Sequence, residues 1–294
     1  MKAISRRQFL KTGAAAGALA GISGLPLRAE AGKATDWVTL GRSGVNVTRL
    51  AFGTGTYGGR VQRELGQDAF TTLVRHAYDS GIRFFETSES YAGMHEMLGV
   101  ALKGIPRENY RLMTKVTTGD GKDPQTKIDE LRRTAQTDYF DIMLLHVQRS
   151  PTWVSETVQW QDVILENEHK QAVRTHGASV HGLPALRQVP GAKWLQIGMI
   201  RMNHNGTRMD MEQPEGDGLG NVNEVVQHVG EAKSAGKGVI SMKLVGEGRF
   251  TNRDDRKAAM RFAFRNAGVD AVTVGTKKPA EIDEAIENIN LAFA

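Results

Sequence analysis

The chain has 294 residues, 40% of them hydrophobic and 24% charged, which is enough for one α/β barrel and unlike a disordered chain or a repeat array. It contains no cysteine, which excludes disulfides, thiolate metal sites and a cysteine nucleophile. The formal net charge is +5, but residues 1–31 carry five basic residues against one acidic residue, so little basicity is left for a nucleic-acid surface.

The amino terminus resembles an export signal of the twin-arginine type. Residues 5–11 read SRRQFLK, an Ala- and Gly-rich apolar stretch follows over residues 12–27, and residues 29–31 form a small-x-small cleavage site. We therefore expect a signal peptide over residues 1–31, the Tat translocase as a partner during export, and a periplasmic or otherwise exported protein. The apolar run is too short and too Gly-rich for a stable membrane span, although retention of the uncleaved signal as an anchor stays open.

The remainder alternates between short apolar runs and amphipathic stretches. A hairpin is predicted first, over residues 37–40 and 47–48. Eight strands then follow, at 49–53, 82–87, 111–116, 140–146, 174–180, 194–200, 238–244 and 271–275. Helical patterns separate them at 69–80, 94–103, 127–134, 222–235, 256–267 and 280–292. This order predicts a (β/α)₈ TIM barrel over residues 32–294; an open doubly wound sheet is the alternative, weakened because no Gly-x-Gly-x-x-Gly follows the first strand.

In such a barrel the functional residues lie where the strands end. Glu86, Tyr91, Lys115 and His146 all fall at or just past predicted strand ends. We expect the lysine and the carboxylate to lower the pKa of the tyrosine phenol, which could then exchange a proton with a carbonyl or alcohol oxygen. Each residue alone is weak evidence, since a lone strand-end lysine is commonly an ion-pair partner.

Several segments together resemble the aldo/keto reductase family. They are RFFETSESY at residues 83–91, MLGVALK at 97–103, LMTK at 112–115, DYFDIMLLH at 138–146 and the opening LGRSGVNVTRL at 40–50. The similarity spans residues 37–294 in order and spacing. It implies an oxidoreductase that uses NADP or NAD to interconvert a carbonyl and an alcohol.

The resemblance also implies roles for individual residues. Tyr91 would be the general acid, Lys115 the group that tunes its pKa, His146 the partner of the carbonyl oxygen, and Glu86 the partner of the lysine. The residues implied to contact the cofactor are Gly53, Thr54, Ser179, Gln196, Lys243, Gly275, Thr276 and Lys277.

The sequence departs from the family pattern at several of these places. Glu86 replaces the usual aspartate, and Met242 stands where many relatives have an aromatic residue. Glu281 stands where many relatives place Arg or Gln near the adenosine; a carboxylate there would repel a 2′-phosphate, whereas Lys277 and its neighbour would attract one, so NADP and NAD both stay open. These departures keep a second function possible, a nucleotide-binding barrel with a non-catalytic sensing or interaction role.

The substrate is less defined by the sequence. The polar segment 201–210 would suit a sugar-derived carbonyl, or it is a surface loop. Trp153 and Trp160 are packing residues or a stacking platform, and His181 could face the substrate. The histidine spacings match no common metal motif, so no metal site is expected.

Overall fold

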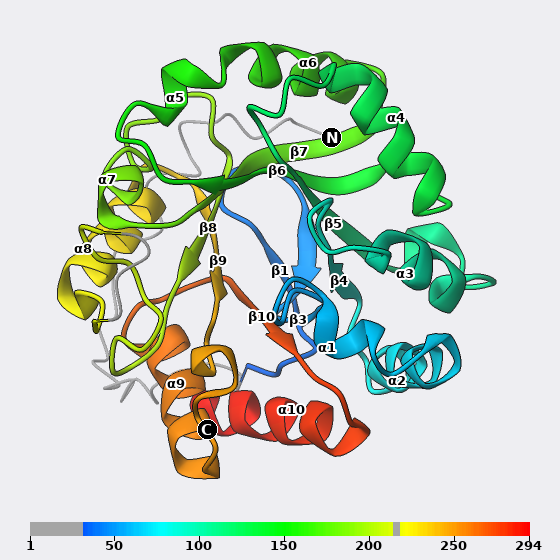
Figure 1. Cartoon of the computed structure of the whole chain (residues 1–294). Helices are drawn as coiled ribbons and strands as arrows, with labels where there is room; N and C mark the ends of the chain where they lie inside the picture. The colour runs from blue at the N-terminus through cyan, green and yellow to red at the C-terminus, as the bar shows by residue number, and fades with distance from the viewer. Residues whose placement is uncertain (1–31, 214–217) are drawn as a thin grey trace, which may run out of the picture. The chain divides into compact units, whose positions relative to one another are not determined.

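The structure is a computed structural model and describes residues 32–213 and 218–294 (Figure 1). The predicted signal peptide and its cleavage site lie outside the described residues. No helix in the described ranges is long and apolar enough to cross a membrane.

Eight parallel strands close into a barrel, with β10 hydrogen-bonded to both β9 and β3. Around the barrel the order is β10-β3-β4-β5-β6-β7-β8-β9. Nearly every strand residue is buried, because one face of each strand fills the interior and the other is covered by helices. The barrel predicted from the alternating pattern is confirmed. The strands are β3 (Leu50–Gly53), β4 (Phe84–Glu86), β5 (Arg111–Val116), β6 (Phe140–Gln148), β7 (Val173–Val180), β8 (Ile197–Arg201), β9 (Gly238–Met242) and β10 (Ala271–Gly275).

Helices surround the strands in Figure 1. Those expected from helical periodicity are α2 (Gln67–Asp79), α3 (Met94–Leu102), α4 (Pro124–Thr134), α8 (Val222–Ser234), α9 (Arg253–Arg265) and α10 (Pro279–Phe293). Those not predicted are α1 (Arg60–Arg63), α5 (Trp153–Glu156), α6 (Val158–His169) and α7 (Leu183–Leu186), with short 3₁₀ turns η1 (Arg107–Asn109) and η2 (Gly246–Gly248). In α2 the buried residues repeat at helical spacing, which explains why such helices could be read from the sequence.

An antiparallel hairpin covers the amino-terminal end of the barrel. It is formed by β1 (Trp37–Thr39) and β2 (Asn46–Thr48). Leu40, Val45 and Val47 belong to the same apolar cluster as the side chains inside the barrel, and Leu40 packs directly on the first residue of β9. The hairpin therefore closes one end of the barrel, and access remains at the end where the strands finish.

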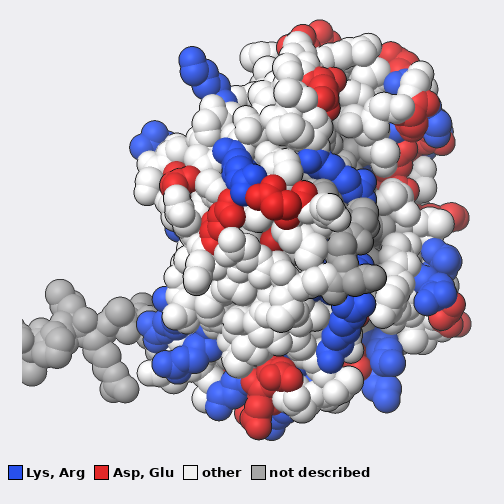
Figure 2. Space-filling view, turned by 60° about the vertical axis from the view of Figure 1, so that its left-hand side comes forward, with Lys and Arg blue, Asp and Glu red and all other residues white. Residues whose placement is uncertain are grey.

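Acidic and basic side chains are interspersed on the face presented in Figure 2. Among the described residues, ion pairs link neighbouring elements, such as Arg256 on α9 with Glu284 on α10, and Arg187 with Glu224 on α8. Such a mixed distribution of charge builds no strong field of one sign over this face.

Candidate active site

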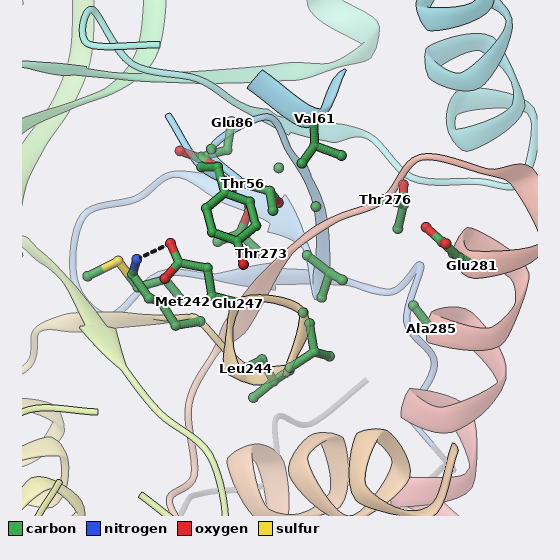
Figure 3. A pocket seen from close by; sticks show the side chains of 18 of the residues that line it. Thr56, Val61, Glu86, Met242, Leu244, Glu247, Thr273, Thr276, Glu281 and Ala285 are labelled. Atoms are coloured by element: carbon green, nitrogen blue, oxygen red, sulfur yellow. Dashed lines mark hydrogen bonds and ion pairs between the residues drawn. The ribbon is translucent and has the colours of Figure 1, made fainter. Parts of the chain in front are cut away.

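A cavity of about 750 Å³ opens at the carboxyl ends of the strands (Figure 3). Its lining comes from the loops after β3, β4, β7 and β9, from residues of β6, β8 and β10, and from the facing sides of α9 and α10. Glu86, Tyr91 and His146, three of the four predicted acid–base residues, line it. The fourth, Lys115, lies directly behind the wall and is 1% exposed.

Lys115 and Glu86 form a buried ion pair between the neighbouring strands β5 and β4. The Lys115 ammonium contacts Glu86 Oε1 and donates a hydrogen bond of 2.9 Å to the carbonyl oxygen of Thr87. Thr273, on β10, donates to the other oxygen of Glu86 at 3.2 Å. Burial lowers the pKa of Lys115, and the carboxylate of Glu86 opposes that shift. Glutamate at position 86 therefore reaches the lysine despite the departure from the family pattern.

Tyr91 lies over this pair. The Lys115 ammonium is 4.7 Å from the centroid of the Tyr91 ring, and a methyl group at Gly55 would lie 2.6 Å from the phenol oxygen. Burial raises the pKa of the phenol well above its usual value, and the carboxylates of Glu86 and Glu247 raise it further. The expected lowering is thus reversed, because desolvation disfavours the phenolate and the carboxylate of Glu86 adds to that effect.

His146, at the end of β6, packs edge-on against Tyr91 with ring centroids 5.7 Å apart. Its Nδ1 lies 3.0 Å from the Ser88 hydroxyl oxygen and 3.1 Å from the Ser90 hydroxyl oxygen. Burial lowers the pKa of the imidazole to about 2, and the positive charge of Lys115 adds to the effect. The ring is therefore neutral at physiological pH; when the hydroxyls donate to Nδ1, the proton sits on Nε2.

The segment that carries Tyr91 is anchored by a buried cation that sequence reasoning missed. Lys127 on α4 is 3% exposed and contacts Glu89 Oε1 at 2.9 Å and Asp120 Oδ2 at 2.7 Å. The second oxygen of Glu89 accepts from the backbone N–H of Thr117 at 2.8 Å. These bonds hold the loop between β4 and α3 against the loop after β5.

Two glycines form part of the cavity wall. A methyl group at Gly53 would lie 2.6 Å from Thr273 Oγ1 and 3.0 Å from Glu86 Oε2, and one at Gly275 would collide with the hydroxyl of Thr56. Both glycines line the cavity, so backbone can approach a ligand where no side chain fits.

Three predicted cofactor contacts do not reach the cavity. Thr54 is fully buried and donates to the carbonyl oxygen of Glu86, and Ser179 is fully buried and accepts from the N–H of Val147. Gln196 precedes the first residue of β8, at the end of the barrel away from the cavity. Met199, further along β8, lines the cavity instead, because strand alternation turns it inward. The expectation that Gln196 reaches the ligand is wrong.

Lys243 lines the cavity as expected, but it is already paired. Its ammonium lies 2.6 Å from Glu247 Oε1, and Arg208 contacts Glu247 Oε2 at 2.9 Å. Lys243 and Glu247 both have φ of 56°, a left-handed conformation uncommon for residues with side chains. Burial works against ionisation of Glu247, but its bonds to Lys243 and Arg208 hold its pKa below the usual value. Sequence reasoning missed Glu247 because its position depends on this backbone conformation.

Gly275, Thr276 and Lys277, which the resemblance implied as cofactor contacts, line the opposite side of the cavity, with Glu281 and Ala285 beside them. Figure 3 shows Thr276, Glu281 and Ala285 across the cavity from Met242 and Glu247. The Thr276 hydroxyl is buried without a hydrogen-bond partner among the described residues.

Of the other residues that the sequence suggested for the substrate site, one lines the cavity and the rest do not. Residues 201–210 bond mainly within their own segment, where Arg201 pairs with Asp210 at 2.9 Å, and none of them lines the cavity. Trp153 is fully buried and Trp160 is 6% exposed, so both pack rather than form a platform. His181 does line the cavity, and burial together with the charge of Arg201 lowers its pKa well below the usual value.

Comparison with known proteins places these observations in context. Residues 49–261, more than half of the chain, match the model of the aldo/keto reductase family, and residues 3–23 match that of the twin-arginine translocation signal sequence. The second match confirms the predicted export signal and supports export by that pathway.

Individual relatives agree with the family match. L-galactose dehydrogenase of Arabidopsis thaliana is 32% identical over 158 residues, which cover 49% of this chain and 48% of that protein. A Glycine max protein named as a probable aldo-keto reductase is 31% identical over 138 residues, 41% of this chain and 39% of its own length. The chain thus spans less than half of the length of these relatives.

Solved structures share the fold at lower sequence identity. A Pseudomonas aeruginosa protein described as an aldo-keto reductase has a TM-score of 0.72 at 20% identity, over 90% of this chain and 98% of that one. An aldo-keto reductase from Klebsiella pneumoniae, solved in complex with NADPH, has a TM-score of 0.64 at 16% identity, over 85% of this chain and 88% of that one.

Proposed function

This chain belongs to the aldo/keto reductase family, and from that premise we propose that it is an exported nicotinamide-dependent oxidoreductase that interconverts a carbonyl and an alcohol. The observation that carries the proposal is the arrangement of Tyr91, His146 and the buried Lys115–Glu86 pair at one end of the cavity. These four predicted residues come from three strands and one loop. Their side chains lie together, and proton transfer to or from a single substrate oxygen requires such proximity.

In the direction of reduction, Tyr91 donates its phenol proton to the carbonyl oxygen. Its raised pKa keeps the phenol protonated at neutral pH, so the donor form is the abundant one. The ammonium of Lys115, 4.7 Å from the ring centroid, stabilises the phenolate that remains after transfer. His146, neutral and adjacent to Tyr91, donates from Nε2 to the same oxygen and orients it.

The cavity suits a nicotinamide dinucleotide, NADP or NAD, which would supply or accept the hydride. The backbone at Gly53 and Gly275 permits close approach, and the unpartnered hydroxyl of Thr276 offers a hydrogen bond. Lys243 lines the cavity and would attract a diphosphate, although its ammonium is paired with the carboxylate of Glu247.

The protein that acts would be the barrel of residues 32–294, after cleavage of residues 1–31. Its substrate would be a small carbonyl or alcohol compound, and a sugar-derived one is compatible with the named relative L-galactose dehydrogenase. His181 and Tyr57 line the same cavity as Tyr91 and His146, and would offer a hydrogen-bonding group and an exposed ring to such a substrate.

Replacement of the phenol hydroxyl tests the proposal. Tyr91→Phe is expected to lower kcat by about 10²–10⁴-fold while the Kd of the dinucleotide changes little, because only proton transfer is lost. Steady-state turnover of an aldehyde panel and fluorescence titration with the dinucleotide measure the two quantities. Tyr139→Phe, at a half-buried position that does not line the cavity, is the matched control. Unchanged turnover in Tyr91→Phe would instead favour a nucleotide-binding barrel with a sensing or interaction role.

A further inference from the structure

The end of the cavity opposite Tyr91 is formed by the loop after β10, the start of α10 and the facing side of α9. Figure 3 shows Glu281 on α10 with its carboxylate on the cavity side, next to Thr276. Because Tyr91 marks the end at which hydride transfer is proposed, the adenosine half of a dinucleotide has to lie at this far end.

This end is built to receive a polar ligand with a flat apolar part. Thr276 is 5% exposed and Asn288 is 1% exposed; both line the cavity, and Thr276 Oγ1 and Asn288 Oδ1 are buried without a hydrogen-bond partner in the described ranges. Met260 and Ala285 provide buried apolar walls beside them. Unpartnered polar atoms at such burial are costly unless a ligand or water pairs with them.

The charges at this end do not favour a second phosphate. Arg256 donates to Glu284 from Nε at 2.6 Å and from Nη2 at 2.9 Å, and its Nη1 donates to the carbonyl oxygen of Phe250 at 3.0 Å. Three N–H groups of the guanidinium are therefore bonded to a carboxylate and a carbonyl, and the carboxylate of Glu284 balances its charge. Among the cavity-lining residues at this end, Lys277 is the remaining cation, and it is exposed.

Glu281 takes the place that a phosphate would favour. It lies in the first turn of α10, which begins at Pro279, and its Oε2 accepts from the backbone N–H of Lys277 at 2.8 Å. Amides and the dipole at a helix amino terminus attract an anion, and here the anion is supplied by the protein. A 2′-phosphate placed here would meet a carboxylate that already accepts from the Lys277 N–H.

We propose that Glu281 makes this site selective for the dinucleotide without a 2′-phosphate, NAD(H), over NADP(H). The inference rests on the proposed function and specifies its cofactor. Glu281 Oε2 is engaged by Lys277, which leaves Oε1 to accept from a ribose hydroxyl. Repulsion between the carboxylate and a phosphate of nearly two negative charges supplies the discrimination.

Equilibrium binding tests this directly. Kd values for NADH and NADPH are measured by fluorescence titration of the purified protein, with no turnover required. We expect NADH to bind at least about tenfold more tightly, and Glu281→Arg to reverse the preference by improving NADPH binding more than tenfold. Raising the salt concentration should reduce the preference of the wild-type protein for NADH over NADPH, because salt screens part of the repulsion between Glu281 and the 2′-phosphate.

The matched control is Glu287→Gln, a carboxylate on the exposed side of the same helix that pairs with Arg253 and does not line the cavity. Its NADH/NADPH ratio should equal that of the wild type, whereas Glu281→Gln should lower the ratio. Tighter binding of NADPH by the wild type, or an unchanged ratio in Glu281→Gln, would overturn this inference alone. Binding of neither dinucleotide would overturn the proposed function and this inference with it.

Discussion

The ammonium of Lys115 and the carboxylate of Glu86 have almost no contact with solvent, at 1% and 3% side-chain exposure. Each ion loses its hydration on burial, so the pair persists because each partner neutralises the other and the remaining atoms are hydrogen-bonded. The hydrogen bonds come from Thr87 and Thr273, on both sides of the pair. The same arrangement keeps a positive charge under Tyr91 without exposing it to water.

Removing the charge of one partner of the Lys115–Glu86 pair should therefore lower the free energy of unfolding. Lys115→Met is expected to lower the free energy of unfolding by about 3–5 kcal/mol, because Glu86 is left buried and unpaired. The double variant Glu86→Gln/Lys115→Met should recover much of that loss, since no uncompensated charge remains. Urea denaturation of both variants gives the two values.

Lys170→Met serves as the control for this cycle. Lys170 pairs with Glu166 at 3.8 Å with both side chains about three-fifths exposed, so its removal should cost less than about 1 kcal/mol. A double variant no more stable than Lys115→Met would mean that lost packing, and not the unpaired charge, accounts for the effect.

At the scale of elements, the sequence predicted strands and helices where the burial pattern is apolar and periodic. Strand β5 matches its predicted bounds, because Leu112–Val116 are all buried in one continuous run. Helix α6 was missed because its buried face includes the amides Gln161 and Asn167, which interrupt the apolar period. Those amides are accommodated by hydrogen bonds, such as that from Asn167 to the carbonyl oxygen of Val163.

A site residue could be predicted where its position follows from the end of a predicted strand. It could not be predicted where its position depends on strand register or on the conformation of a loop. Lys115 and His146 lie close to the carboxyl ends of well-predicted strands, so their meeting follows from barrel topology. The role of Gln196 came from the resemblance and not from its place in the strand; β8 begins at Ile197, and Met199 is the β8 residue that lines the cavity. Glu247 reaches the cavity because its backbone is in the left-handed conformation, and no local sequence pattern predicts that conformation.

Two helical glycines are expected to respond oppositely to the same substitution. A methyl group at Gly230, on the exposed side of α8, meets nothing within 4 Å, whereas one at Gly99 in α3 would lie 2.7 Å from the carbonyl oxygen of Ala135. Gly230→Ala should raise the free energy of unfolding by about 0.5–1 kcal/mol, because alanine loses less backbone entropy in a helix.

Gly99→Ala should lower the free energy of unfolding, because α3 would have to move away from the backbone that follows α4. Chemical denaturation of the two variants, made in the same background, provides the comparison. Stabilisation by both substitutions would show that α3 and the Ala135 segment are not packed as closely as the structure indicates.

At the scale of the whole molecule, the two ends of the barrel have separate tasks. Leu40, Val45 and Val47 close the amino-terminal end, and the ligand cavity occupies the other. None of these three residues lines the cavity, so the amino-terminal closure contributes to stability without contacting a ligand. This division follows from the general placement of function in such barrels at the ends of the strands.

Leu40→Ala tests that division. Leu40 is fully buried and packs on Gly238, so its truncation should lower the free energy of unfolding by about 2–5 kcal/mol through lost burial and a cavity. Leu291→Ala, at a position 41% exposed on α10, should change it by less than about 1 kcal/mol. Well below the unfolding transition, the dinucleotide Kd of Leu40→Ala should stay within about twofold of the wild type, since sites this far apart act independently. A stable variant with much weaker binding would mean that the hairpin end and the cavity are coupled through the barrel interior, where Met242 belongs both to the interior cluster and to the cavity wall.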